Sequence, residues 1–83
     1  MPIKIKSPVS LKASRMNPAK AHDRIAEISA AALEGDDEKA HGLEGNLHVN
    51  VLDAIAKGTC WRPRLCAAIA SSSKKIDFQR WDA

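Results

Sequence analysis

The bulky apolar side chains that could build a core are few in this chain. Leucine, isoleucine, valine and phenylalanine together number 17 of the 83 residues, and 14 alanines make up much of the remaining hydrophobic content. A chain of this length has room for one domain, and it buries only roughly 60–65% of the surface that its unfolded form exposes. The sequence therefore predicts a small domain with a modest core and low intrinsic stability, which favours support from a partner.

Local start and stop signals divide the chain into helices. Asn17 followed by Pro18 is a strong helix start, because asparagine accepts hydrogen bonds from free amides and proline fits the first helical turn. Gly35 and Gly58 are placed to end helices in a left-handed conformation, and Pro63 opens another helix. We therefore expect an all-α class: a single helical domain over residues 17–83 with three main helices near 18–34, 36–57 and 63–72, an extended basic N-terminal arm over 1–16, and a short C-terminal helical turn within 76–81.

Residues 47–51 are ambiguous, because their apolar positions fit both a helical stripe and the alternation of a strand. We choose helix, since no partner strand is evident. Gly42 and Gly45 each cost about 1 kcal/mol inside a helix, so a break near Asn46 is an alternative. The helical stripes predict a core made of Ile25, Ile28, Leu33, Leu43, Leu47, Val51, Ile55, Leu65 and Ile69.

The charged residues are sorted along the sequence. Residues 1–20 carry five cations and no acid, residues 21–53 have a net charge of −6, and residues 54–83 return to +4. The net charge of +3 therefore hides a dipolar distribution. Such a distribution steers a small protein toward charged partners, and it favours a binding protein over a catalyst.

No motif in the sequence points to catalysis, a metal ion or a cofactor. His22, His41 and His48 with Cys60 and Cys66 lack the short ligand spacing of structural zinc sites. The two cysteines are too few to staple a secreted protein, so we interpret them as reduced thiols of a cytoplasmic protein. No apolar run reaches the ~20 residues that a membrane span needs. We therefore expect no enzyme activity, no cofactor and no membrane partner.

Aromatic and cationic side chains concentrate around the third expected helix and the tail. Trp61 precedes Arg62, and Trp81 lies two residues from the C-terminus. Tryptophan and arginine are enriched at the energetic hot spots of protein interfaces, although the two rings could instead close the small core. We expect the following residues to bind a partner: Trp61, Arg62, Arg64, Lys74, Lys75, Arg80 and Trp81.

The same cations could contact phosphates, so nucleic acid is an alternative partner. Two registers of a helix-turn-helix motif fit in part. In the first, serines occupy the turn positions 71–73, which need apolar residues and glycine; in the second, Thr59 and Arg64 stand where apolar residues belong. The alternative function is therefore a small DNA-binding transcriptional regulator with a degenerate helix-turn-helix.

The segments Val51–Gly58, Leu65–Ala70 and Ile76–Trp81 resemble parts of small uncharacterised phage and prophage accessory proteins. In size and charge contrast those proteins are similar to anti-CRISPR and other anti-defence inhibitors, which act mostly by binding a host complex. The resemblance covers the C-terminal third and implies no particular functional residues. It implies a non-catalytic module that inhibits a protein or ribonucleoprotein complex stoichiometrically in the cytoplasm of a bacterial host, and it leaves the oligomeric state open.

Overall fold

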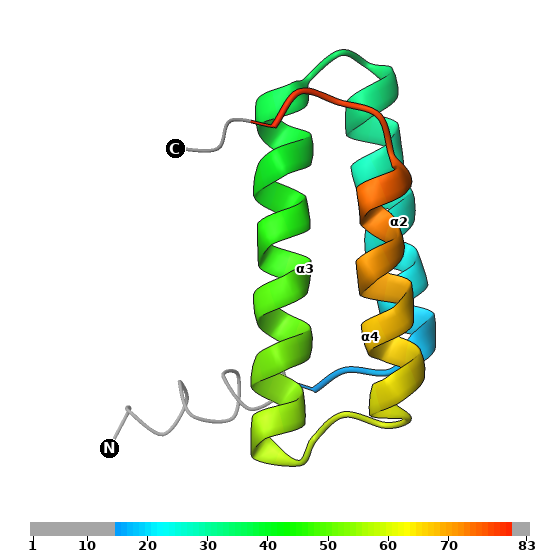
Figure 1. Cartoon of the computed structure of the whole chain (residues 1–83), viewed down its shortest axis with the longest axis vertical. Coiled ribbons are helices and arrows are strands. Elements are labelled where there is room, and N and C mark those ends of the chain that lie inside the picture. Colours follow the sequence, from blue (N-terminus) through cyan, green and yellow to red (C-terminus); the bar gives the residue numbers. More distant parts are fainter. Residues whose placement is uncertain (1–14, 81–83) are drawn as a thin grey trace, which may run out of the picture.

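The computed structural model describes residues 15–80, and these residues form a bundle of three helices with no strand among them. The helices are α2 (Pro18–Leu33), α3 (Asp37–Lys57) and α4 (Pro63–Ser71), and the short 3₁₀ helix η1 (Ser72–Lys75) continues α4. In Figure 1, α3 runs downward on the left, and α2 and α4 run upward on the right, with α4 in front of α2. The expected all-α class with three main helices is confirmed. Most of the expected N-terminal arm, and Trp81, lie outside the described residues.

The ends of α2 follow the expected signals. The Asn17 side chain accepts a hydrogen bond from the Lys20 amide at 2.8 Å, and Pro18 occupies the first turn. After the helix, Gly35 adopts a left-handed conformation with φ of 81°. This conformation lets the Gly35 amide donate to the Ala32 carbonyl, and it turns the chain into α3 within a few residues.

Helix α3 is continuous over 21 residues, so the helical interpretation of residues 47–51 is confirmed and the chain does not break at Asn46. It begins where the Asp36 carboxylate accepts from the Lys39 amide at 3.1 Å. Asp37 in the first turn and Lys57 in the last turn complement the helix dipole. Gly58, at φ of 74°, ends the helix as expected.

Replacing Gly42 and Gly45 by alanine should stabilise the protein. Both glycines lie within α3 on its exposed side, and an added Cβ would meet no atom within 4 Å at either position. Each substitution should raise the free energy of unfolding by about 0.5–1 kcal/mol, because alanine loses less backbone entropy than glycine in a helix. The midpoint of urea unfolding measures the gain. Gly58→Ala is the matched control, and its positive φ should give the opposite sign.

Alanines build much of the core and let the helices approach closely. The buried set consists of Met16, Ala21, Ile28, Ala31, Ala40, Leu47, Val51, Ala54, Cys66, Ile69, Ala70 and Phe78. The expectation of a buried side chain is wrong for Leu33, Ile55 and Leu65, which are 88%, 39% and 41% exposed. Because small residues occupy the contact lines between the helices, these bulkier neighbours are left at the edges of the packed faces.

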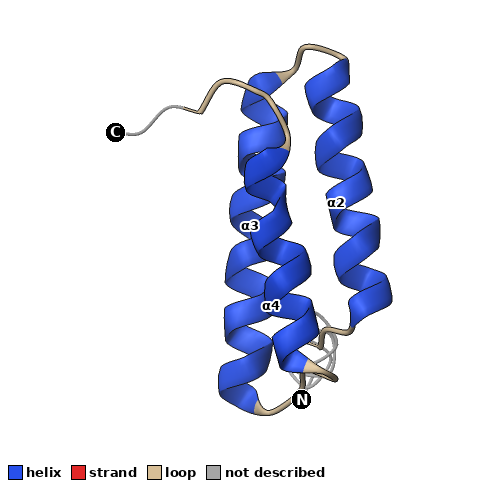
Figure 2. Ribbon diagram, turned by 45° about the vertical axis from the view of Figure 1, so that its right-hand side comes forward, coloured by secondary structure: helices blue, strands red, loops and turns tan. Residues whose placement is uncertain are grey.

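Two extended segments close the bundle at its two ends. At the lower end in Figure 1, the Met16 amide donates to the Thr59 carbonyl and the Trp61 amide donates to the Met16 carbonyl at 2.9 Å. Met16, one residue before the expected domain boundary at residue 17, is buried there. At the upper end, the tail after η1 crosses toward α3 (Figures 1 and 2).

The short C-terminal turn lies earlier than expected. It is η1, over Ser72–Lys75, whereas residues 76–80 are not helical. The hydroxyl of Ser72 donates to the Ile69 carbonyl, which illustrates how the serines compete with the α-helical ladder at this point. The non-helical tail places Phe78 in the core and carries Arg80 back over α3.

Candidate functional site

The structure divides the predicted binding residues between the two ends of α4. Trp61, Arg62 and Arg64 lie at its N-terminal end, in the connection from α3 and the first turn. Lys74 and Lys75 are exposed on η1, beyond its C-terminal end. Arg80 follows in the tail at that same end (Figure 1), and Trp81 lies outside the described residues. The candidates therefore form two groups rather than one surface.

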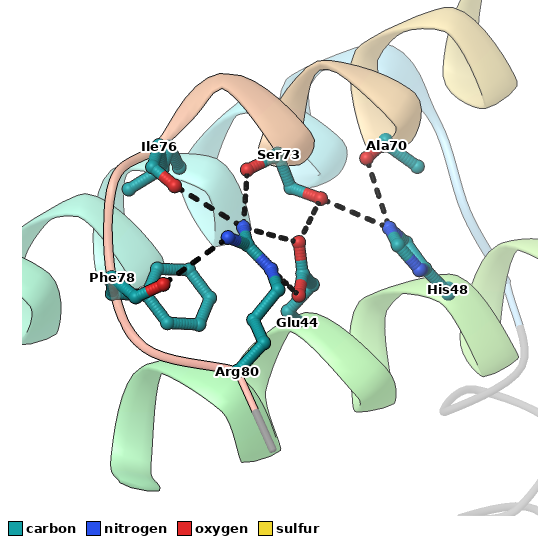
Figure 3. A network of polar contacts seen from close by, with 7 residues as sticks. All are labelled: Glu44, His48, Ala70, Ser73, Ile76, Phe78 and Arg80. Atoms are coloured by element: carbon teal, nitrogen blue, oxygen red, sulfur yellow. Dashed lines mark hydrogen bonds and ion pairs between the residues drawn. The ribbon is translucent and has the colours of Figure 1, made fainter. Parts of the chain in front are cut away.

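Arg80 is engaged within the chain by four of the residues drawn in Figure 3, which are Glu44, Ser73, Ile76 and Phe78. Its guanidinium donates to both carboxylate oxygens of Glu44, from Nε to Oε1 at 2.9 Å and from Nη2 to Oε2 at 3.0 Å. The same group donates to the carbonyls of Ser73 at 2.9 Å and Ile76 at 3.2 Å, and it lies 3.7 Å over the centre of the Phe78 ring. These contacts hold the tail against α3.

Glu44, His48, Ser73 and Arg80 together form a polar cluster, here called the Glu44 cluster. The Ser73 hydroxyl donates to Glu44 Oε2 at 2.6 Å. His48 Nε2 lies 3.0 Å from the Ala70 carbonyl and 3.0 Å from Ser73 Oγ. Because the carbonyl can only accept, Nε2 carries the hydrogen, and the serine oxygen accepts from it while donating to Glu44. The cluster thus ties α3, α4, η1 and the tail together.

The arrangement of the Glu44 cluster does not suit nucleophilic catalysis. A serine nucleophile needs a base that takes its proton and an oxygen that can reach a substrate. Here the Ser73 hydroxyl donates to a carboxylate, the histidine acts as donor toward it, and Ser73 is fully buried. The physical role of the cluster is to fix the end of the bundle.

Glu44 remains charged although it is only 6% exposed. Burial by itself raises the pKa of this carboxyl group. The hydrogen bonds from Arg80 and Ser73, together with the positive charge of Arg80, outweigh burial and hold the pKa of Glu44 below its ordinary value. The unfolded chain, which lacks these contacts, therefore takes up a proton at this site more readily than the folded protein.

The stability of the protein should accordingly fall in acid. Because the folded-state pKa of Glu44 is lowered, its contribution is fully present above the ordinary carboxyl pKa of 4.5, and it is lost as the pH drops from there through the folded-state value. Unfolding in urea at a series of pH values measures the effect. Glu44→Gln should remove this part of the pH dependence. If Glu44→Gln and the wild type lost the same amount of stability as the pH falls, Glu44 would not be the group responsible.

The other group of candidates lies where three helix ends meet. In residues 15–21 and 54–66, which form the start of α2, the end of α3 and the start of α4, every charged residue is a cation. We call this region the basic end, and its cations are Arg15, Lys20, Lys57, Arg62 and Arg64. Lys57 forms an ion pair with Asp53 at 3.2 Å, one turn earlier in α3. Both arginines at the start of α4 are exposed.

Trp61 stands out at the basic end because it is 66% exposed. The Arg62 guanidinium lies 5.5 Å from the centre of its ring, which is a cation–π contact. Arg62 itself has φ of 59°, and it is the only residue other than glycine with a positive φ in the described part of the chain. A left-handed arginine costs free energy, and such strain is common where a side chain must be presented to a partner.

A surface hollow adjoins this pair. It is lined by Arg62, Pro63, Arg64, Leu65 and Ala68, so its lining is mostly apolar and includes two arginines. Leu65, which the sequence places in the core, is thereby available to a partner. The basic end combines an aromatic ring, exposed aliphatic side chains and cations, which is the composition of an interface centre with a charged rim.

The opposite end of the bundle carries charges of both signs. Glu34 and Asp36 belong to the connection from α2 to α3, and Asp37, Glu38 and Lys39 belong to the first turn of α3. Lys74 and Lys75 belong to η1, which lies toward the same end of the bundle (Figure 1). The fold therefore keeps a basic end but brings the acidic residues of the middle segment together with lysines at the opposite, mixed end. Lys74 also borders a groove between α3 and α4 that includes Leu52 and Ala67, but no aromatic residue lines it.

The Glu44 cluster is not among the sites predicted from the sequence. One signal for it exists: Glu44 occupies the buried stripe of α3 between Ala40 and Leu47, where a carboxylate needs a partner. Its partners stand 29 and 36 residues later in the chain, so no local pattern identifies them.

Comparison with known proteins finds no relative of this chain. The chain matches no protein-family model, no curated protein and no solved structure. Within residues 15–80, no three histidine, cysteine or acidic side chains gather as a metal site would require. None of the helices in this range is long and apolar enough to span a membrane.

Proposed function

We propose that this chain is a non-catalytic protein-binding module that uses its basic end to occupy a surface of a larger assembly. The observation that carries the proposal is Trp61, which is largely exposed and stacked under the strained Arg62. Aromatic rings of this size are usually covered in a small protein, and an exposed tryptophan beside arginines fits an anchor for a partner. The cations around it favour a partner whose surface combines acidic groups with an apolar pocket.

The target class in this proposal follows from the resemblance of the C-terminal third to phage and prophage accessory proteins. The module would act stoichiometrically, by covering a surface that a bacterial defence complex needs for its protein or nucleic-acid partner. A domain with a small core suits this role, because binding to the target adds to its stability. The charge separation between the two ends speeds the encounter at low salt.

The DNA-binding alternative has less support in the geometry. A helix-turn-helix joins two helices at roughly 90–120° through a short turn. Here α3 and α4 lie antiparallel and side by side (Figures 1 and 2). In the other register, two of the three turn serines are part of η1 itself, and a non-helical tail follows η1 as far as residue 80. Neither register of the motif gives a recognition helix in the required position. DNA binding is therefore kept as one outcome of the test.

Affinity capture from a nuclease-treated bacterial lysate tests the proposal. The full chain should retain a protein or ribonucleoprotein, and the retention should be lost when Arg62 and Arg64 are both changed to glutamate. Both residues lie at a turn and a helix start, where acids are tolerated, so helicity should be unchanged. If the wild type retains no protein but binds purified duplex DNA with a steep salt dependence, the module is a DNA-binding protein and the proposal is wrong.

A further inference from the structure

Two thiols come together at the basic end, although the sequence spacing suggests otherwise. Residues 60 and 66 would lie on roughly opposite sides of a helix that contained both. In the structure only Cys66 belongs to α4, whereas Cys60 lies in the connection before it. The sulfurs of both residues approach one acceptor, the Trp61 carbonyl oxygen, at 3.3 Å from Cys66 and 3.9 Å from Cys60.

The backbone on either side of this thiol pair is held in place. Cys60 is bridged to Met16, whose carbonyl accepts from the next amide in the chain, that of Trp61. The Cys66 amide donates to the Arg62 carbonyl in the first turn of α4. Two thiols that a fixed backbone holds beside one acceptor lose less chain freedom on forming a disulfide than the same thiols do in an unfolded chain.

The two thiols differ in reactivity. Cys60 is half-buried, whereas Cys66 is fully buried. Burial, together with the neighbouring Cys60 thiol, raises the pKa of Cys66 to about 11. Since the thiolate is the attacking species, Cys60 is the thiol that an external reagent reaches first, and Cys66 is the thiol that resolves the product.

We propose that Cys60 and Cys66 form a redox-active pair that closes into an intramolecular disulfide by exchange with a small-molecule disulfide of the glutathione type. In the first step the Cys60 thiolate attacks one glutathione sulfur, and a glutathione thiolate leaves. In the second step the Cys66 thiolate attacks the Cys60 sulfur of the mixed disulfide, and the second glutathione thiolate leaves. The protein loses two electrons and two protons, and glutathione disulfide is reduced to two thiols.

The closed ring contains Trp61, Arg62 and Arg64. Oxidation therefore fixes the turn that carries the exposed aromatic ring and its cations. The chemical step needs only the protein and a small-molecule disulfide, and it does not rest on the proposed function.

Thiol–disulfide equilibria of the full chain in glutathione buffers test this inference, measured under native conditions and again in guanidinium chloride. The equilibrium constant for forming the Cys60–Cys66 disulfide should be roughly ten-fold or more larger in the folded chain than in the unfolded chain, because folding pre-positions the sulfurs. Trypsin cuts after Arg64, so the product should appear as the linked peptides 58–64 and 65–74 from a protein of monomeric mass. Cys66→Ser should stop at the mixed disulfide, and Cys60→Ser should stay reduced while folded. The proposal would be overturned if the folded wild type stopped at the mixed disulfide. It would also be overturned if the folded wild type formed the Cys60–Cys66 disulfide no more favourably than the unfolded chain.

Discussion

Replacing Arg80 by alanine should lower the free energy of unfolding by about 3 kcal/mol, as is typical when one partner of a buried ion pair is removed. The variant leaves the Glu44 carboxylate in the core with Ser73 as its remaining hydrogen-bond donor among the contacts described above. It also removes the donor that the Ser73 and Ile76 carbonyls share, and it uncovers one face of Phe78. The loss is large for a domain of this size.

Urea unfolding of Arg80→Ala beside Lys75→Ala measures this effect. Lys75 is exposed on η1, at the same end of the bundle, so its substitution should change the stability by no more than about 0.5 kcal/mol. Arg80→Lys keeps the charge but loses the two parallel hydrogen bonds to Glu44, and it should fall between the two. If Arg80→Ala were as stable as Lys75→Ala, the Glu44 cluster would have no structural role.

Replacing Trp61 by alanine should weaken partner binding by about 30-fold, which corresponds to the ~2 kcal/mol that defines a hot spot. The stability of the isolated domain should change little, because the ring is 66% exposed and its backbone hydrogen bond to Met16 remains. Leu33→Ala is the matched control: it also removes an exposed apolar side chain, but at the other end of the bundle. Isothermal titration against the captured partner gives both affinities. Equal losses in the two variants would contradict a specific role for Trp61.

The helices were predictable because their boundaries depend on nearest neighbours in the chain. Asn17, Pro18, Gly35 and Gly58 each act through a backbone conformation or a hydrogen bond within a few residues. The continuity of α3 through Gly42 and Gly45 was less certain. It arises from packing, since Leu47, Val51 and Ala54 on one face of α3 are buried in the core.

The details of the core and the site depend on contacts between distant residues. The stripes of α2 and α4 contain so many alanines that the pattern does not fix how each helix is rotated, and Leu33 and Leu65 were assigned to the wrong side. Arg80 was predicted only as a surface cation, because nothing near it in the sequence shows that Glu44 is its partner. The exposure of Trp61 could be suspected from its neighbours, but the left-handed conformation of Arg62, whose guanidinium lies over the ring, could not.

The affinity of two charge-reversal variants for the captured partner tests the central claim, that the basic end is the binding surface, most directly. One variant changes Arg62 and Arg64 to glutamate, and the other changes Lys74 and Lys75 to glutamate at the opposite end of α4. Both reverse two exposed cations, so they alter the net charge of the protein equally. The account predicts a loss of about ten-fold or more in the arginine variant and a much smaller loss in the lysine variant. Unchanged binding in the arginine variant, or equal losses in both, would contradict it.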